Sequence, residues 1–265
     1  MSRFIGQTKL MSILDSYTPQ TLPKTLMFIG AQGCGKHTLA KYLANKFEFD
    51  LIEIDDGITS SQLESFLYST VNKLYLIDLN KFSEKQQNQV LKFTEEPSSS
   101  VYIILLANSE VNVLNTIINR CVKYHFEPYT KEQIEAILNT NVNDLAFTIY
   151  QTPGKLLNLT ENSFKNVLSL AGYTISEIGS LPYANALAIG TKINYKDLYN
   201  KIDFNLFFDT VEYLAFEAFK KNNNMQSFTI FKVTNQFKQY STKQNLIKET
   251  LMLNYLTTLW EALQV

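Results

Sequence analysis

Short apolar runs alternate with amphipathic segments in the first half of the chain. Helical spacing of apolar residues predicts helices over 7–15, 37–47, 83–96 and 110–119. Between them lie short runs rich in aliphatic and aromatic residues, which predict buried strands. The predicted strands are 25–29, 51–54, 74–78, 101–107 and 122–126. Strands separated by helices favour a mostly parallel sheet that is covered on both faces.

The pattern changes after Pro128, where no further strand is predicted. Three short helices are expected at 130–139, 143–151 and 154–161, and the rest of the chain has helical periodicity, with long runs at 204–221 and 243–264. We therefore predict an α/β domain over 1–127, a small helical domain over 128–162 and an all-helical C-terminal domain over 163–265.

A glycine-rich loop lies between the predicted strand 25–29 and the helix that follows it. It reads Gly-Ala-Gln-Gly-Cys-Gly-Lys-His-Thr over 30–38. In a strand–loop–helix setting this is a P-loop, whose backbone amides, helix N-terminus and lysine all bind nucleotide phosphates. The residues predicted to form the site are Gly30, Gly33, Cys34, Gly35, Lys36, His37 and Thr38.

At the positions where proteins with this motif bind Mg²⁺ and activate water, this chain has different residues. His37 stands where a P-loop has a serine or threonine hydroxyl, and imidazole is a poor ligand for this hard cation. Asp78 ends the strand 74–78, where a Walker-B aspartate would hold Mg²⁺, or where an aspartate would simply cap the next segment. Leu79 follows in place of the glutamate that orients water, and it can do no acid–base work.

Charge and cysteine content narrow the class of protein. The 24 basic and 25 acidic residues give a net charge of −1, so no overall basic field favours nucleic acid. Only Arg3 and Arg120 are arginines. Two cysteines cannot form a disulfide framework or a cysteine-rich zinc site, and no apolar stretch reaches ~18 residues. We expect a reduced, soluble, intracellular protein without membrane segments.

Taken together, the motifs resemble those of the AAA+ subunits of DNA sliding-clamp loaders, most of all the bacterial DNA polymerase III delta-prime group. Ile5-Gly6-Gln7 resembles the N-terminal box of this family, and the segment 91–97, Leu-Lys-Phe-Thr-Glu-Glu-Pro, resembles its "LLKTLEEP" segment. The run 104–109 resembles the sensor-1 strand, and Asn119-Arg120-Cys121 is similar to the Ser-Arg-Cys motif.

This resemblance implies an AAA+ P-loop domain with a parallel sheet, followed by a helical lid and a helical collar. It implies ATP or ADP as the ligand of a degenerate site that includes Asp78 and Asn108, with Mg²⁺ left open and no zinc or other metal ligand. Arg120 corresponds to the arginine finger, which acts in trans on the ATP of a neighbouring subunit. Leu157 stands where the family has a phosphate-sensing arginine, and the role of Lys155 is left open.

The leading hypothesis is therefore a delta-prime-like subunit with weak or absent ATP hydrolysis of its own. The implied partners are other clamp-loader subunits in a hetero-oligomer, a sliding clamp, and primed DNA through local contacts, in the cytoplasm of a bacterium or a phage-infected host. Two alternatives stay open: an active AAA+ clamp-loader ATPase of a phage, with Thr38 or another unusual metal ligand, and a P-loop small-molecule kinase.

Overall fold

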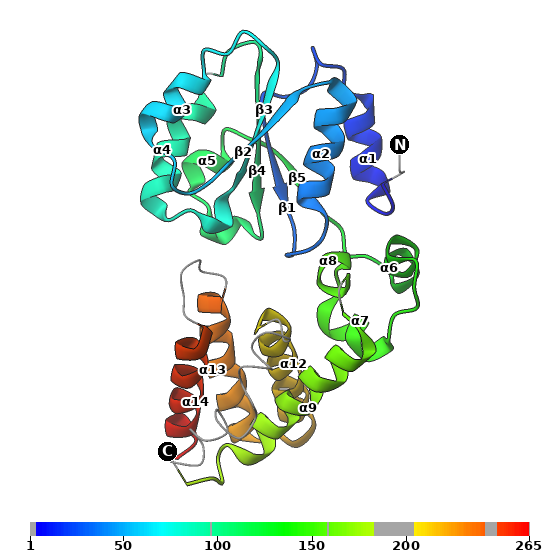
Figure 1. Cartoon of the computed structure of the whole chain (residues 1–265), viewed down its shortest axis with the longest axis vertical. Coiled ribbons are helices and arrows are strands. Elements are labelled where there is room, and N and C mark those ends of the chain that lie inside the picture. The colour runs from blue at the N-terminus through cyan, green and yellow to red at the C-terminus, as the bar shows by residue number, and fades with distance from the viewer. Residues whose placement is uncertain (1–3, 96, 158, 183–203, 242–247, 265) are drawn as a thin grey trace. The chain divides into compact units, whose positions relative to one another are not determined.

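The computed structural model describes residues 4–95, 97–157, 159–182, 204–241 and 248–264 (Figure 1). The chain divides into two compact units. The first comprises Met1–Val142 with Gln151–Gly154, and the second comprises Asn143–Tyr150 with Lys155–Val265. The three-part division at 127 and 162 stays a prediction. Arg3 lies outside the described residues.

The first unit is built on a parallel five-stranded sheet with the strand order β2-β3-β4-β1-β5. All five predicted strands are confirmed, each within one residue of its expected ends. The strands are β1 (Thr25–Ile29), β2 (Asp50–Ile54), β3 (Lys73–Asp78), β4 (Val101–Ala107) and β5 (Val122–His125). Because the strands are parallel, the loop after β1 begins at the same edge of the sheet as the loops after the other strands. Since β4 pairs with β1, this loop begins beside the end of β4.

Helices cover both faces of this sheet (Figure 1). Helices α1 (Thr8–Ser16) and α2 (Lys36–Phe47) pack on one face. The other face carries α3 (Ser60–Phe66), α4 (Glu84–Glu95) and α5 (Asn115–Ile118). Successive β1 side chains point to opposite faces and all five are buried, so both faces of the strand are covered and residues 26–29 form a continuous apolar run.

Two helical segments differ from the prediction. Helix α3 was not predicted, although Thr59 and Gln62 form a capping box at its start. The single helix expected over 110–119 is wrong. A 3₁₀ turn, η2 (Glu110–Asn112), is separated from α5 by the extended backbone of Val113 and Leu114.

The described part of the chain beyond β5 is helical and contains no strand, as predicted. Helix α6 (Lys131–Leu138) belongs to the first unit and α8 (Pro153–Leu156) crosses the division. The second unit contains α7 (Asp144–Tyr150), α9 (Glu161–Glu177), α12 (Phe204–Asn222), α13 (Met225–Ser241) and α14 (Lys248–Leu263). The expected helix 154–161 is too long, since α8 ends at Leu156 and Thr160 caps α9.

Four of these helices, α9, α12, α13 and α14, share one aromatic-rich core. Tyr255 is fully buried in it and meets Phe208 edge-to-face, with 5.1 Å between ring centroids. Its hydroxyl is satisfied by Thr234 at 2.8 Å. The early residues of the run predicted at 243–264 lie outside the described residues. None of the described helices combines the length and the apolar character needed to span a membrane.

Candidate functional site

The glycines of the loop between β1 and α2 are required by its geometry. Gly33 and Gly35 have φ angles of 81° and 99°, a left-handed conformation that residues with a Cβ adopt only with strain. At Gly30 the restriction is space, because a Cβ there would lie 2.7 Å from the Cβ of Phe126 and 3.0 Å from the Sγ of Cys34. The chain therefore keeps the backbone shape of a phosphate loop.

Lys36 is the buried cation of this loop. Its Nζ donates to the carbonyl oxygens of Gly30 and Ala31, the latter at 3.0 Å, and to the Asn108 Oδ1 at 3.1 Å. Burial lowers the pKa of Lys36, while the charges of the Cys34 thiolate form and Asp78 act in the opposite direction. A buried ammonium group that is surrounded by neutral oxygens lacks a counter-charge, so an anionic phosphate beside it would stabilise its charged form. The structure thus brings together Lys36 and Asn108, two predicted site residues that are 72 residues apart in the sequence.

Cys34 is a structural member of the loop. Its side chain is buried, and its carbonyl accepts a hydrogen bond from the Tyr129 hydroxyl at 2.9 Å. Burial raises the pKa of the thiol, against the opposing effect of Lys36, so the group stays neutral near neutral pH. It packs in the loop as a small apolar residue.

The surroundings of the two residues after Lys36 do not favour metal binding by either of them. Thr38 is exposed. The His37 Nε2 lies 3.9 Å from the Glu53 Oε2, on the edge strand β2, and Lys41 also contacts Glu53 at 3.3 Å. His37 is thus turned toward a surface carboxylate.

Asp78 caps the 3₁₀ turn η1 (Leu79–Lys81), which agrees with the capping alternative given for it above, while its partner Asn80 was not predicted. The Asn80 side-chain amide donates to the Asp78 Oδ1 at 2.5 Å, and the Asn80 backbone amide donates to the same oxygen at 3.2 Å. The Asn80 Oδ1 in turn accepts from the Asn108 backbone amide at 2.8 Å. Asparagine belongs to no motif at this position, and only the fold brings its two partners together.

These residues do not fit a magnesium site. Mg²⁺ needs oxygen ligands in near-octahedral geometry, yet Asp78 already accepts two N–H groups at one oxygen and His37 offers none. Within the described residues, no group of three or more His, Cys, Asp or Glu side chains is placed to hold a metal ion. The loop thus keeps the glycines and the lysine that this motif uses for phosphate, and position 37 lacks the hydroxyl that this motif uses for Mg²⁺.

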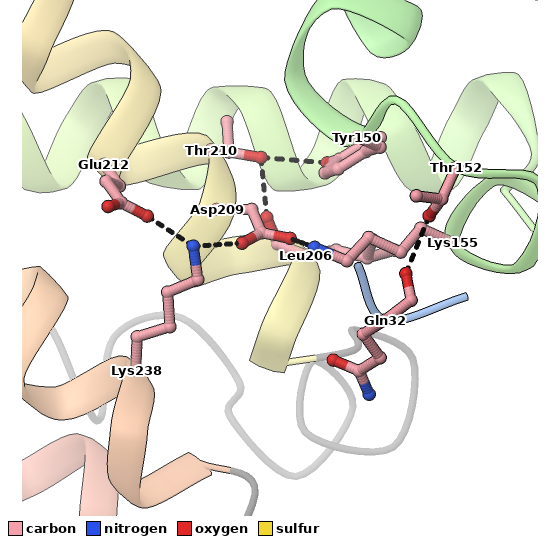
Figure 2. A network of polar contacts seen from close by, with 9 residues as sticks. All are labelled: Gln32, Tyr150, Thr152, Lys155, Leu206, Asp209, Thr210, Glu212 and Lys238. Carbon is pink, nitrogen blue, oxygen red and sulfur yellow. Dashed lines mark hydrogen bonds and ion pairs between the residues drawn. The ribbon is translucent and has the colours of Figure 1, made fainter. Parts of the chain in front are cut away.

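A segment remote in sequence closes against the phosphate loop. The Thr152 Oγ1 donates to the carbonyl of Gln32 at 2.9 Å (Figure 2), and the Gly154 amide donates to the carbonyl of Gly33 at 2.8 Å. Both pairs lie in the first unit. Leu157, at the expected phosphate-sensing position, is 64% exposed and has no group that could bind phosphate.

Lys155 belongs to the second unit, where it forms an ion pair with Asp209 of α12. Asp209 also pairs with Lys238 of α13, at 2.7 Å, and Lys238 contacts Glu212 (Figure 2). The side chain of Asp209 is only 4% exposed. Lys155 is therefore a member of a buried charge network that joins α8, α12 and α13.

Arg120 lies just after α5 at the surface of the first unit. Its guanidinium donates to the Thr116 carbonyl at 2.7 Å and to the Glu95 carboxylate at 2.9 Å. Cys121 beside it is half-buried, donates through its Sγ to the Ile117 carbonyl, and has a thiol pKa raised by burial to about 12. The predicted finger is thus ordered by α4 and α5, with its charge paired to Glu95.

Comparisons with known proteins agree with the motif set. A family model described as "DNA polymerase III, delta subunit" matches residues 59–130. The DNA polymerase III subunit delta' of Bacillus subtilis is 34% identical over 164 residues, which cover 49% of this chain and 50% of that protein. The DNA polymerase III subunit tau of Escherichia coli is 26% identical over 208 residues, which cover 65% of this chain.

The chain spans about a third of the length of that tau subunit, 32%. Among solved structures, a DNA polymerase III gamma subunit-related protein of Thermotoga maritima superposes with a TM-score of 0.49 at 15% identity. The match covers 97% of this chain and 99% of that one.

Proposed function

We propose that this chain, which is related to the AAA+ clamp-loader subunits of bacterial DNA polymerase III, acts as a delta-prime-like subunit. In this role it donates Arg120 to the ATP site of a neighbouring subunit during loading of a sliding clamp onto primed DNA. Its place is then the cytoplasm of a bacterium or an infected host. Its own site would hold ATP or ADP without efficient hydrolysis.

The position of Arg120 in the sheet carries the proposal. The β1–β5 register pairs Leu26 with Val122, so the start of β5 is level with a residue four positions before Gly30. At ~3.3 Å per strand residue, the start of β5, which Arg120 precedes by two residues, is about 13 Å along the sheet from the phosphate loop of the same chain. One arginine side chain cannot span that length, so a phosphate contact by Arg120 requires the nucleotide of another subunit.

The pairing of Arg120 supports the same role. Its side chain is 36% exposed and that of Glu95 is 44% exposed. An ion pair so open to water contributes about 0–1 kcal/mol to stability. The guanidinium can therefore exchange Glu95 for a phosphate group at little cost, and its planar fork suits bidentate phosphate binding.

The other half of the proposal, weak hydrolysis by the chain itself, is supported by three replaced groups. His37 faces Glu53 rather than a metal position, and Leu79 is buried in the core. Leu157 offers no cation to phosphate. Each replacement removes a different contribution, namely metal binding, water activation or phosphate sensing.

The test is ATP turnover by the complex reconstituted from this chain and its partner subunits. Arg120→Ala and Arg120→Lys should both lower turnover by at least ~100-fold, since arginine fingers contribute 10³–10⁵ in rate. Lysine should not rescue activity because a single ammonium lacks the bidentate fork. The isolated chain should show no turnover above background.

Lys123→Ala is the matched control. Lys123 is three residues from Arg120 and is also paired to a glutamate, Glu110, at 3.0 Å. Its loss should leave turnover within about twofold of wild type, because an exposed pair contributes little. Full turnover by a correctly assembled Arg120→Ala complex would contradict the finger role.

A further inference from the structure

Asn80 connects two predicted site residues that do not contact each other directly. It lies in the 3₁₀ turn η1 (Leu79–Lys81) directly after β3. Leu79 is 2% exposed and anchors this turn in the core. The side-chain amide has two fixed partners: its nitrogen donates to Asp78 and its oxygen accepts from the backbone amide of Asn108. These contacts together determine which way the amide points.

The Asn80 link completes a line of hydrogen bonds across the site. The Lys36 Nζ donates to the Asn108 side chain at 3.1 Å, the Asn108 backbone amide donates to Asn80 at 2.8 Å, and Asn80 donates to Asp78 at 2.5 Å. The line runs from the phosphate-loop lysine, past the end of β4, to the end of β3. It holds the charged groups Lys36 and Asp78 in a defined relation to each other.

In a magnesium-dependent site the cation offsets the repulsion between the Walker-B carboxylate and the phosphates. Here two N–H groups of Asn80 are directed at one oxygen of Asp78, Oδ1, so a cation at that oxygen would compete with them. Hydrogen bonds to a carboxylate stabilise its charge, so Asn80 performs locally part of what the cation does elsewhere. The missing hydroxyl at His37 removes the second protein ligand.

We propose that the phosphate loop binds nucleoside di- or triphosphate free of divalent cation, with Asn80 as the positioning residue that holds Asp78 in place of the metal. This rests on the proposed function to the extent that both assume a degenerate nucleotide site. The ligand class is a free polyphosphate nucleotide, recognised by the loop amides and by Lys36. The expected distinction from an ordinary P-loop is that chelating Mg²⁺ leaves binding intact.

The experiment is calorimetric titration of the full chain with ADP, once in excess MgCl₂ and once in excess EDTA. Wild type should bind with dissociation constants that agree within about twofold. Asn80→Asp keeps the shape but replaces the donor with a second carboxylate beside Asp78. Its affinity in EDTA should fall by at least ~10-fold, and MgCl₂ should recover most of that loss, because paired carboxylates repel phosphate and bind cations.

Asn88→Asp on α4 is the control, because it adds the same charge outside the hydrogen-bonded line and should change neither titration. Asn80→Ala tests the geometry without added charge and should acquire a measurable preference for MgCl₂. Thermal melts of each variant show whether it folds, and a folded Asn80→Asp that binds like wild type in EDTA would contradict the role of Asn80.

The remaining outcomes separate this inference from the proposed function. Wild-type binding that is at least ~10-fold tighter in MgCl₂, or no binding under either condition, overturns the metal-free site while leaving Arg120 to be judged by the turnover of the complex. Magnesium-dependent binding with ATP hydrolysis by the isolated chain overturns both the metal-free site and the non-hydrolysing role.

Discussion

The backbone amide of Gly154 donates to the carbonyl of Gly33 at 2.8 Å, which joins the start of α8 to the middle of the phosphate loop. The approach is so close that a Cβ on Gly154 would lie 2.7 Å from the Gly33 Cα and 2.8 Å from its carbonyl oxygen. Both obstacles are backbone atoms, so neither can rotate away. Glycine at 154 is therefore required by a contact with a residue 121 positions earlier in the chain.

We expect Gly154→Ala to loosen the phosphate loop. The added methyl group must push the 151–154 segment away from Gly33, at a cost of about 1–3 kcal/mol typical of overpacking. Hydrogen exchange followed by mass spectrometry should then show faster exchange in the peptide that covers the loop at 30–36, and the melting temperature should fall.

The same substitution at Gly172 gives the opposite expectation. Gly172 lies inside α9, and a Cβ there would meet nothing within 4 Å. Alanine in a helix interior is favoured over glycine by roughly 0.5–1 kcal/mol. Gly172→Ala should therefore raise the melting temperature slightly and leave exchange in the loop unchanged. Equal effects at both positions would mean that the close approach of Gly154 has no energetic consequence.

A second prediction concerns Tyr75, in the middle of β3. Its ring is fully buried, stacked on Phe66 at 5.0 Å and edge-on to Phe93 at 5.3 Å. Among the described residues its hydroxyl has no hydrogen-bond partner. A buried unsatisfied hydroxyl costs about 1–3 kcal/mol. We expect Tyr75→Phe to keep the ring contacts and to raise the free energy of unfolding by about 1 kcal/mol.

Tyr102→Phe provides the comparison in the next strand, β4. The Tyr102 hydroxyl donates to the carbonyl of Pro19 at 2.6 Å. Removing it leaves that carbonyl without this donor, so stability should fall by about 1 kcal/mol. Chemical unfolding of both variants, followed by circular dichroism, shows whether each substitution raises or lowers the free energy of unfolding. A loss of stability in Tyr75→Phe would indicate that water satisfies the hydroxyl.

The strands and the phosphate loop were predictable from sequence because their signals are local. Strands buried on both faces read as continuous apolar runs, as in Val101–Ala107. The three glycines before Lys36 lie at fixed positions of the loop. Two of them, Gly33 and Gly35, have a left-handed backbone, and the third, Gly30, is closely packed. Helix α3 also had a local signal, the capping box of Thr59 and Gln62, which a systematic search for such pairs finds.

The rest of the site depends on tertiary contacts that no local pattern encodes. Asn80 matters only because the parallel register brings the end of β3 beside that of β4, where Asn108 follows. Lys155 pairs with Asp209, which is 54 residues further along the chain. The sequence cannot tell a surface lysine from one that a buried carboxylate holds in place.

That carboxylate is the basis of a third prediction. Asp209 is almost fully buried and receives both Lys155 and Lys238. Asp209→Asn retains the size of the side chain but leaves two partly buried ammonium groups without their common counter-charge. Breaking a buried ion pair in this way typically costs about 3–5 kcal/mol.

The measurement can be confined to the second unit. Trp260 is the single tryptophan of the chain and lies on α14. Its fluorescence in urea reports the unfolding of this unit, and Asp209→Asn should shift the midpoint to much lower urea. Glu217→Gln removes the partner of Lys220 in an exposed pair of the same helix and should change stability by less than ~0.5 kcal/mol. Similar midpoints for the two variants would contradict a special role for the network.

The last prediction follows from Lys238, at the opposite end of the same network. Burial disfavours its charged form, but the carboxylates of Asp209 and Glu212 outweigh this effect, and the pKa of Lys238 is raised. A lysine in an unfolded chain titrates near ~10.4. Because the folded pKa lies higher, the folded state holds the proton more tightly, and the resulting stability is fully present below ~pH 10 and lost as the pH rises through the folded pKa.

Lys238→Met removes this proton-linked contribution. The difference in unfolding free energy between wild type and Lys238→Met should stay constant between ~pH 7 and ~pH 9 and shrink above ~pH 10.4, again read from Trp260 fluorescence. Lys165→Met, which removes an exposed pair with Glu161 on α9, should change stability little over the whole range. A difference that grows with pH would mean that burial, rather than the two carboxylates, dominates at Lys238, and that Asp209 is held mainly by Lys155.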